Sequence, residues 1–285
     1  MEFVQVDVFA DEVYGGNPLA VFLDAEDLSR LQMQAIAREM NLSESAFVIR
    51  ASDDSYDVRI FTPAEELAFA GHPTIGTAWV LRHLERVKGD ELTQHTARGQ
   101  TALRVDGDCL WFTRSGAVEP DLDERAPDVS HRIARALGIG PEEVELEARE
   151  LGRSGRLRPA FSDAGLRQLM VPVRDVEVLS RCRVPGDLEE LARDGVYCFT
   201  ALQAGRVRAR GLFPGFGVPE DPGTGSAGAA LGLYLADRIG PIGFEIVQGV
   251  EIARPSRIFV KAEKGSVEVG GKCHLVLTGR LERLP

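Results

Sequence analysis

The sequence predicts an α+β protein made of two related halves. Strand-like and helix-like patterns are mixed both before and after a polar, charged segment that runs from Pro120 to Pro141. The chain has 285 residues, enough for two domains of ordinary size. A short set of identities also recurs at a fixed spacing, which is the trace that an internal duplication leaves.

The first half contains strand signals separated by an amphipathic helix. A Gly15-Gly16-Asn17-Pro18 turn separates the first two strands. Apolar residues spaced as on one helix face predict a helix that includes Leu28 to Ile36, and Asn41 suits its C-terminal cap. The expected strands are Phe3–Phe9, Leu19–Phe22, Ala46–Ile49 and Tyr56–Phe61.

The polar segment marks the expected boundary between the halves. It includes a short helix from His131 to Leu137, and strands and helices are mixed again after it. We therefore place an N-terminal half at residues 1–118 and a C-terminal half at residues 119–285. This division permits the last strand of the C-terminal half to pack against the N-terminal half.

The internal repeat lies around two glycine turns. Five identities are each 152 positions apart: Phe61 with Phe213, Gly71 with Gly223, Gly76 with Gly228, Ala78 with Ala230, and Leu81 with Leu233. Identities of such common residue types are compatible with chance. Both stretches also share one order, a strand, an acidic loop, a glycine turn and a helix of small residues, and this order favours duplication.

Charge and cysteine content narrow the classes of function. The 33 basic and 44 acidic residues give a net charge of -11, which argues against a nucleic-acid or membrane surface. No apolar run approaches the roughly 20 residues of a membrane helix, and the acidic N-terminus does not resemble a secretory signal. Cys109, Cys182, Cys198 and Cys273 are far apart and form no C-x-x-C pair, so we expect reduced thiols in a cytoplasmic protein.

Both glycine turns have the composition of an anion-binding helix start. Pro73 suits a first helical turn in Gly71-His72-Pro73-Thr74, and two glycines allow close backbone approach in Gly223-Thr224-Gly225-Ser226. Helix N-termini carry partial positive charge and can hold a carboxylate. Tight helix packing would explain the same small residues, so both interpretations stay open at this point.

Several common catalytic patterns are absent from the sequence. No lysine accompanies Thr224 or Ser226, as a phosphate-binding loop would require, and no glycine lies two residues before Ser226, as a nucleophile elbow requires. No G-x-G-x-x-G follows a strand, so we expect no nicotinamide cofactor. We expect no metal either, because four histidines are isolated from one another: His83, His95, His131 and His274.

Three titratable residues near the turns are candidates for acid–base chemistry. His72 lies inside the first turn, where a helix N-terminus would keep it neutral. Asp221 comes directly before the second turn, and Glu44 follows a helix end and precedes an apolar strand. A partly buried carboxylate there would suit proton transfer. The ordinary alternatives are a structural histidine, a capping aspartate and a surface glutamate.

These residues make the chain resemble the phenazine-biosynthesis PhzF family, which has the diaminopimelate-epimerase fold. The resemblance covers nearly the whole chain and is dense up to about Val80 and from Phe213 to Glu263. It is carried by Gly16–Val21, Met40–Ser45, Phe61-Thr62-Pro63, Phe69–Pro73, Glu220-Asp221, Thr224–Ala227, Gln248–Ile252 and Arg254-Pro255-Ser256.

The resemblance implies a fold and a set of site residues. It implies two similar domains, each a mixed sheet wrapped around a central helix, with helices starting at Pro73 and near Ser226 and the active site in the cleft between the domains. The glutamate at the place of Glu44 removes and returns substrate protons in the family, and groups matching His72 and Asp221 assist. Groups matching Gly71, Gly225 and Ser226 line the binding site, and members are commonly homodimers.

The resemblance also implies a reaction without metal or organic cofactor. The well-known family reaction isomerises trans-2,3-dihydro-3-hydroxyanthranilate by moving a proton from C3 to C1. Epimerases of this fold use two cysteines at the helix starts, whereas Ala70 and Pro222 stand there in this chain. Two alternatives remain: an isomerase or epimerase acting on another small cyclic or amino-acid-like carboxylate, and a non-catalytic binding protein. The presence of Glu44, His72 and Asp221 together counts against the second.

Overall fold

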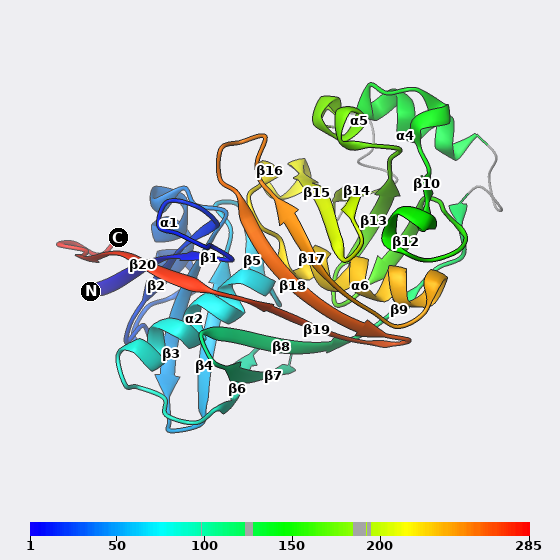
Figure 1. The fold of residues 1–285 in the computed structure, drawn as a ribbon. Helices are drawn as coiled ribbons and strands as arrows, with labels where there is room; N and C mark the ends of the chain where they lie inside the picture. Colours follow the sequence, from blue (N-terminus) through cyan, green and yellow to red (C-terminus); the bar gives the residue numbers. More distant parts are fainter. Residues whose placement is uncertain (98, 123–127, 185–191, 193–194) are drawn as a thin grey trace. The chain divides into compact units, whose positions relative to one another are not determined.

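The computed structural model describes residues 1–97, 99–122, 128–184, 192 and 195–285, and it divides into two compact units (Figure 1). Unit 1 comprises Met1–Thr113 and Gly270–Pro285, and unit 2 comprises Arg114–Val269. The last strand, β20 (Cys273–Arg280), pairs antiparallel with β1 (Glu2–Val8), so both ends of the chain lie in unit 1.

Unit 1 is a mixed sheet with two helices. Its remaining elements are β2 (Asn17–Phe22), α1 (Arg30–Met40), β3 (Glu44–Ala51), β4 (Ser55–Phe61), β5 (Glu66–Leu67), α2 (Gly71–His83), β6 (Glu91–Thr96), β7 (Gly99–Asp106) and β8 (Cys109–Ser115). The predicted helix cap is confirmed: Asn41 is left-handed, with φ of 52°, and its N–H donates to the Ala37 carbonyl.

Unit 2 has more numerous short elements. Its strands are β9 (Ala117–Val118), β10 (Leu146–Glu147), β11 (Arg156–Leu157), β12 (Ala160–Asp163), β13 (Arg167–Pro172), β14 (Val196–Gln203), β15 (Arg206–Phe213), β16 (Val218–Asp221), β17 (Ile242–Gln248), β18 (Ser256–Glu263) and most of β19 (Ser266–Gly271). Its helices are α4 (Val129–Leu137), α5 (Val176–Arg181) and α6 (Gly225–Ile239), with 3₁₀ turns at Pro141–Glu143, Ala148–Leu151 and Pro214–Phe216. The short helix predicted at His131 to Leu137 is confirmed as α4.

In both units, successive strand pairs alternate between antiparallel and parallel in the same order. In unit 1, β1–β2 is antiparallel, β2–β3 parallel, β3–β4 antiparallel and β4–β6 parallel. In unit 2, β12–β13, β13–β14, β14–β15 and β15–β17 repeat that series. The strands β3 and β14 even begin and end 152 residues apart. This agreement confirms the predicted pseudo-symmetric architecture.

The central helices are α2 and α6, and each is buried on every side near its start. The buried residues of α2 include its whole stretch from Gly71 to Ala78, and those of α6 run from Gly225 to Ala236. Glycines allow strands to approach closely. A Cβ on Gly76 would lie 2.6 Å from Leu19, and one on Gly232 would lie 2.7 Å from Val260. A helix apolar all round has to be enclosed in this way.

The helix starts correct two details of the sequence prediction. The helix α2 begins at Gly71, two residues before the predicted Pro73, because the Thr74 N–H already donates to the Ala70 carbonyl. The starts of α2 and α6 are 154 residues apart, so Gly71 corresponds to Gly225 and the predicted match with Gly223 is wrong. The reason is strand length: β16 has four residues where β5 has two. None of the helices in the described part of the chain is long and apolar enough to cross a membrane.

Candidate active site

Glu44 and His72 meet at the start of α2 in unit 1. Glu44 is the first residue of β3 and His72 the second residue of α2. Glu44 Oε2 lies 3.5 Å from His72 Nδ1, and the same nitrogen lies 3.1 Å from Asn17 Nδ2 at the start of β2. The side chain of His72 is 3% exposed and that of Glu44 16% exposed. Two of the three predicted acid–base residues therefore share a buried corner of unit 1.

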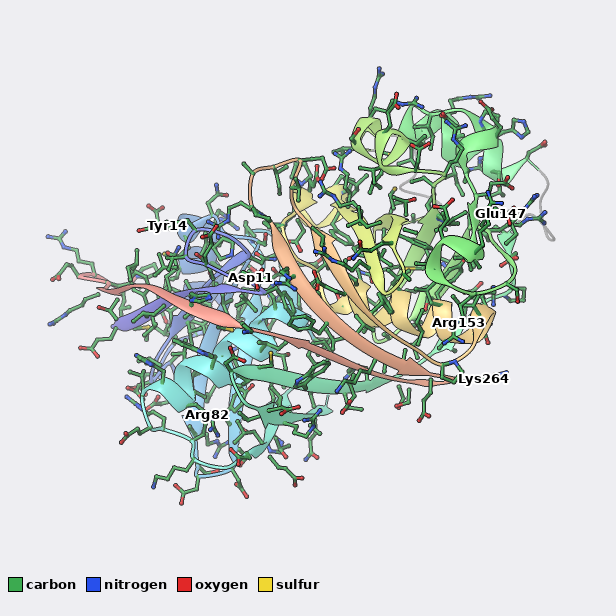
Figure 2. All side chains as sticks on the ribbon, viewed as in Figure 1. Asp11, Tyr14, Arg82, Glu147, Arg153 and Lys264 are labelled. Atoms are coloured by element: carbon green, nitrogen blue, oxygen red, sulfur yellow. The ribbon has the colours of Figure 1, made fainter. Side chains whose placement is uncertain are left out.

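The turn before β2 places Asn17, which the sequence analysis did not single out as a site residue. Gly16 has φ of 62°, and a Cβ there would lie 2.3 Å from the Val8 carbonyl, so only glycine fits. The buried Asp7 carboxylate accepts the Tyr14 N–H at 2.6 Å, while the Tyr14 side chain points outward (Figure 2). The Gly16-Asn17-Pro18 segment of the family resemblance was the signal that could have identified Asn17.

His72 is neutral, and its contacts indicate where its proton resides. Burial lowers its pKa to about 3. The Asn17 amide nitrogen can only donate, so its contact with Nδ1 favours the tautomer with the proton on Nε2. That Nε2 is buried and has no hydrogen-bond partner among the described residues. The predicted neutral state is supported, although burial, not the helix terminus, is its main cause.

In unit 2, the short connection between β16 and α6 brings Asp221 near Gly225 and Ser226 in the sequence. Asp221 is the last residue of β16, and Gly225 and Ser226 are the first two residues of α6. Asp221 is 4% exposed, and its Oδ2 accepts the Thr224 hydroxyl at 2.5 Å. The N-terminal cap position of α6 is held by Thr224, so Asp221 is not the capping aspartate of the ordinary alternative.

Both central helices start without a side-chain cap. Ala70 has no polar side chain, and the Thr224 hydroxyl donates to Asp221 rather than accepting from the helix amides. The predicted substrate-binding residues Gly71 and Gly225 hold equivalent first positions, and His72 and Ser226 hold equivalent second positions. Uncapped amides at a helix N-terminus favour an anion such as a carboxylate.

Cysteines and metal-type clusters are found at neither helix start. The four cysteines are free: Cys109 lies in β8, Cys182 follows α5, Cys198 lies in β14 and Cys273 in β20. Among the described residues, no group of three or more His, Cys, Asp or Glu side chains has the arrangement of a metal site. The polar groups at the two starts are therefore carboxyl, imidazole, amide and hydroxyl groups.

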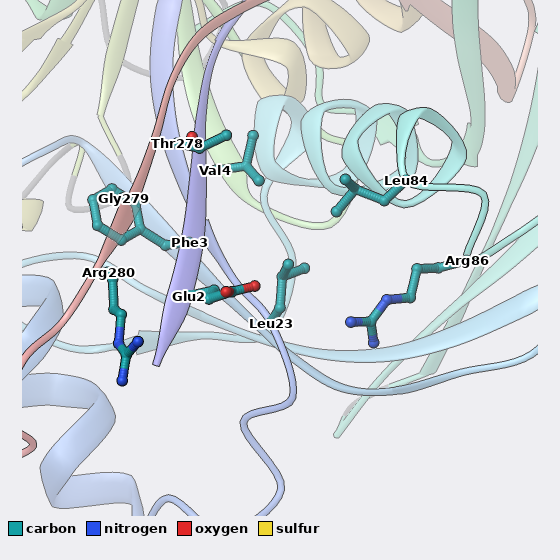
Figure 3. A pocket seen from close by; sticks show the side chains of 9 residues that line it. All are labelled: Glu2, Phe3, Val4, Leu23, Leu84, Arg86, Thr278, Gly279 and Arg280. Atoms are coloured by element: carbon teal, nitrogen blue, oxygen red, sulfur yellow. The ribbon is translucent and has the colours of Figure 1, made fainter.

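A surface pocket of unit 1 is separate from these residues (Figure 3). Its volume is about 680 Å³, and the Arg86 guanidinium in its wall is paired with Asp24 at 2.5 and 3.0 Å. It is lined by Glu2, Phe3, Val4, Leu23, Leu84, Arg86, Thr278, Gly279 and Arg280. None of the predicted site residues borders it.

Comparison with known proteins identifies relatives over nearly the whole chain. The model of the PhzC-PhzF family, described as phenazine biosynthesis-like protein, matches residues 6–279. The chain is 37% identical over 300 residues to trans-2,3-dihydro-3-hydroxyanthranilate isomerase of Pseudomonas aeruginosa, covering 98% of each chain.

Solved structures agree with this result. A predicted epimerase from Pseudomonas aeruginosa is 32% identical and superposes with a TM-score of 0.80 over 99% of both chains. A probable proline racemase from Agrobacterium radiobacter K84 is 14% identical, with a TM-score of 0.61 over 98% of this chain and 92% of that one, which shows the fold alone. The predicted fold class, the resemblance and the assignment to isomerases are confirmed. The chain belongs to the phenazine biosynthesis-like (PhzC-PhzF) family.

Proposed function

We propose that this protein moves a proton on a small carboxylate substrate without a cofactor, and that Glu44 carries the proton. The observation that carries the proposal is the Glu44–His72 contact of 3.5 Å in a buried setting. A carboxylate beside a neutral imidazole can take and return a proton without a compensating change of charge on its neighbour. Glu44 holds the position whose family counterpart performs this transfer.

The substrate we propose is trans-2,3-dihydro-3-hydroxyanthranilate, which is named for the relative that is 37% identical. Ionised Glu44 takes the proton from C3, and the electron pair of that bond shifts through the conjugated system. The acid form of Glu44 then returns the proton to C1, so no proton is gained or lost overall. The product enol tautomerises to the ketone.

The other predicted site residues have supporting roles in this proposal. Gly71, Gly225 and Ser226 match the family groups that line the binding site, and uncapped amides at a helix N-terminus favour an anion such as the substrate carboxylate. His72 donates from Nε2, its protonated nitrogen, and Asp221 assists the transfer as an oriented carboxylate. We also propose a cytoplasmic homodimer, which rests on the free cysteines and on the family resemblance. Light scattering of the purified protein tests the dimer.

The test is incubation of the purified protein with this dihydrohydroxyanthranilate in deuterated water, followed by mass spectrometry of the product. We expect substrate loss with a solvent deuteron at C1 of the product, because a carboxyl proton exchanges with solvent between removal and return, and a further deuteron from ketonisation of the enol. A folded protein that leaves the substrate unchanged would contradict the proposed substrate. Screening of other small cyclic and amino-acid-like carboxylates would then separate an isomerase of different specificity from a non-catalytic binding protein.

A further inference from the structure

A chain of hydrogen bonds that begins in the buried interior of unit 2 ends on Asp221. The Tyr197 hydroxyl donates to Gln248 Oε1 at 2.7 Å, and Gln248 Nε2 donates to Thr224 Oγ1 at 2.9 Å. The Thr224 hydroxyl donates in turn to Asp221 Oδ2 at 2.5 Å. Tyr197 and Gln248 are fully buried, on β14 and at the end of β17. We call these three residues, Tyr197, Gln248 and Thr224, the relay.

The direction of every bond in the relay is determined. Gln248 Oε1 also accepts the Thr224 backbone N–H at 3.2 Å, so the oxygen of this amide faces two donors. Its nitrogen, which can only donate, faces the Asp221 carbonyl at 2.8 Å and the Thr224 hydroxyl oxygen. The Thr224 proton therefore points to Asp221. Burial and the nearby Asp221 charge raise the pKa of Tyr197, which keeps this phenol a donor.

Close backbone packing holds the relay in place. Gly211 is the strand partner of Asp221, and a Cβ on it would lie 2.8 Å from Thr224 Oγ1 and 2.9 Å from Gln248 Nε2. Gly249 has φ of 76°, and a Cβ on it would lie 2.5 Å from the Pro222 carbonyl. The backbone therefore packs directly against the Thr224 hydroxyl and the Gln248 amide, and this contact limits the positions open to both side chains.

Unit 1 contains a similar set of bonds that ends differently. The Tyr56 hydroxyl lies 3.1 Å from both Gln94 Oε1 and the Thr74 carbonyl oxygen, and Gln94 Nε2 donates to Thr74 Oγ1 at 3.0 Å. The Thr74 hydroxyl then donates to the Ala70 backbone carbonyl at 2.8 Å. Gln94 and Gln248 are 154 residues apart, the same interval as the two helix starts. The set in unit 1 thus ends on a neutral backbone carbonyl, which is enough for a structural role. The set in unit 2 ends on a carboxylate.

We propose that Tyr197, Gln248 and Thr224 are positioning residues that hold Asp221 as an oriented carboxylate through the Thr224 hydroxyl. The inference rests on the proposed role of Asp221 in proton transfer. A hydroxyl that donates to a carboxylate favours its charged form, and charge-assisted bonds of this kind are stronger than neutral ones. Losing the Thr224 hydroxyl therefore makes the Asp221 carboxylate easier to protonate.

The relay includes one titratable group, and an ion pair precedes Asp221 in the chain. Tyr197, inside it, is kept protonated by burial. Glu220 precedes Asp221 and is held by Arg210 through bonds of 2.9 and 2.7 Å, with both side chains less than 10% exposed. Neither group changes when Thr224 alone is replaced, so Thr224 substitutions isolate the last bond of the relay.

The test compares Thr224→Val with Thr224→Ser, using Thr74→Val as the matched control in unit 1. Valine keeps the shape and removes the hydroxyl, while serine restores it. We expect the acidic limb of the kcat/KM profile to move up by about one pH unit in Thr224→Val and to return in Thr224→Ser. We expect Thr74→Val to leave the position of this limb unchanged. A Thr224→Val profile that superimposes on the wild type would overturn the proposal.

A second measurement needs no turnover and separates this inference from the proposed function. Carbon-13 NMR of protein labelled at the aspartate carboxyls gives the titration of Asp221, identified as the resonance missing in Asp221→Asn. We expect its midpoint to rise by about one pH unit in Thr224→Val, whatever the substrate is. An inactive wild type with this shift rejects the proposed substrate and supports the relay. An active wild type without the shift supports the function and rejects the relay.

Discussion

The starts of the two central helices have the same backbone plan and different chemistry. Both helices lie in the crossover between two parallel strands, begin with glycine and lack a side-chain cap. In unit 1 the acid–base groups stand on β3 and α2, as Glu44 and His72. The equivalent positions in unit 2 hold Val196 and Ser226, neither of which can titrate near neutral pH.

The carboxylate of unit 2 comes from a third position. Asp221 ends β16, whereas Leu67 ends the corresponding β5. The two units therefore share the backbone arrangement at the helix start. Their titratable side chains stand at different positions of that arrangement. The uncapped helix starts are thus common to both units, whereas the titratable side chains beside them differ. Substitutions in matched positions can separate these two contributions.

The largest effect on stability is expected where the central helices touch their sheets. In Gly232→Val, the new Cβ would lie 2.7 Å from Val260 and 2.8 Å from Val267, so strands or helix must shift. We expect a loss of about 3 kcal/mol in the free energy of unfolding. Gly243→Val on β17 is the control, because the nearest atom to its Cβ lies 3.9 Å away. Urea denaturation that gives equal stabilities for both variants would show that α6 is not closely enclosed.

A smaller, pH-dependent effect is expected at His72, of at most about 2 kcal/mol between pH 6.5 and 5. Its folded pKa of about 3 is below the ordinary 6.5, so the unfolded chain binds the proton first as the pH falls. Stability from this group is therefore present above pH 6.5 and is lost between pH 6.5 and 3, by at most about 1.4 kcal/mol per pH unit. We expect the melting temperature of the wild type to fall more steeply than that of His72→Gln between pH 6.5 and 5. Parallel curves would mean that His72 is accessible to protons in the folded state.

The smallest effect is expected at the outer ends of the two buried hydrogen-bond sets. Tyr56→Phe and Tyr197→Phe each remove one hydroxyl donor to a glutamine oxygen, at 3.1 and 2.7 Å. We expect each variant to lose about 1 kcal/mol of unfolding free energy. Only Tyr197→Phe should also change the pH profile of turnover, because only its set ends on a carboxylate. An equal change in the pH profile of turnover in both variants would contradict the proposed difference between the two hydrogen-bond sets.

Much of the fold was predictable because repeating patterns report on it directly. Alternation marked β1 and β4, and the helix period together with Asn41 marked α1. Close packing, one of the two interpretations of the small residues, is observed inside the central helices, and anion binding at their starts stays a prediction. Gly71 and Gly225 begin helices, whereas Gly76 and Gly232 make room for strands.

The rest depends on contacts between residues that are distant in sequence. A fixed spacing of 152 residues correctly matches Phe61 with Phe213, the last residues of β4 and β15. It does not include the shift of two residues that the longer β16 introduces after them. Gln248 was noticed only inside a family motif, since no local pattern shows that its amide reaches Thr224. Part of the segment from Pro120 to Gly195 lies outside the described residues.

The most direct test of the central claim is the turnover of Glu44→Gln beside Glu39→Gln, an exposed glutamate on α1. Glutamine keeps the shape of Glu44 and cannot carry the proton. We predict a fall in kcat of about 10³-fold for Glu44→Gln, with the melting temperature and binding of a substrate-like carboxylate close to the wild type, and no change for Glu39→Gln. A folded Glu44→Gln protein that isomerises trans-2,3-dihydro-3-hydroxyanthranilate at the wild-type rate would contradict the account and exclude Glu44 as the proton carrier.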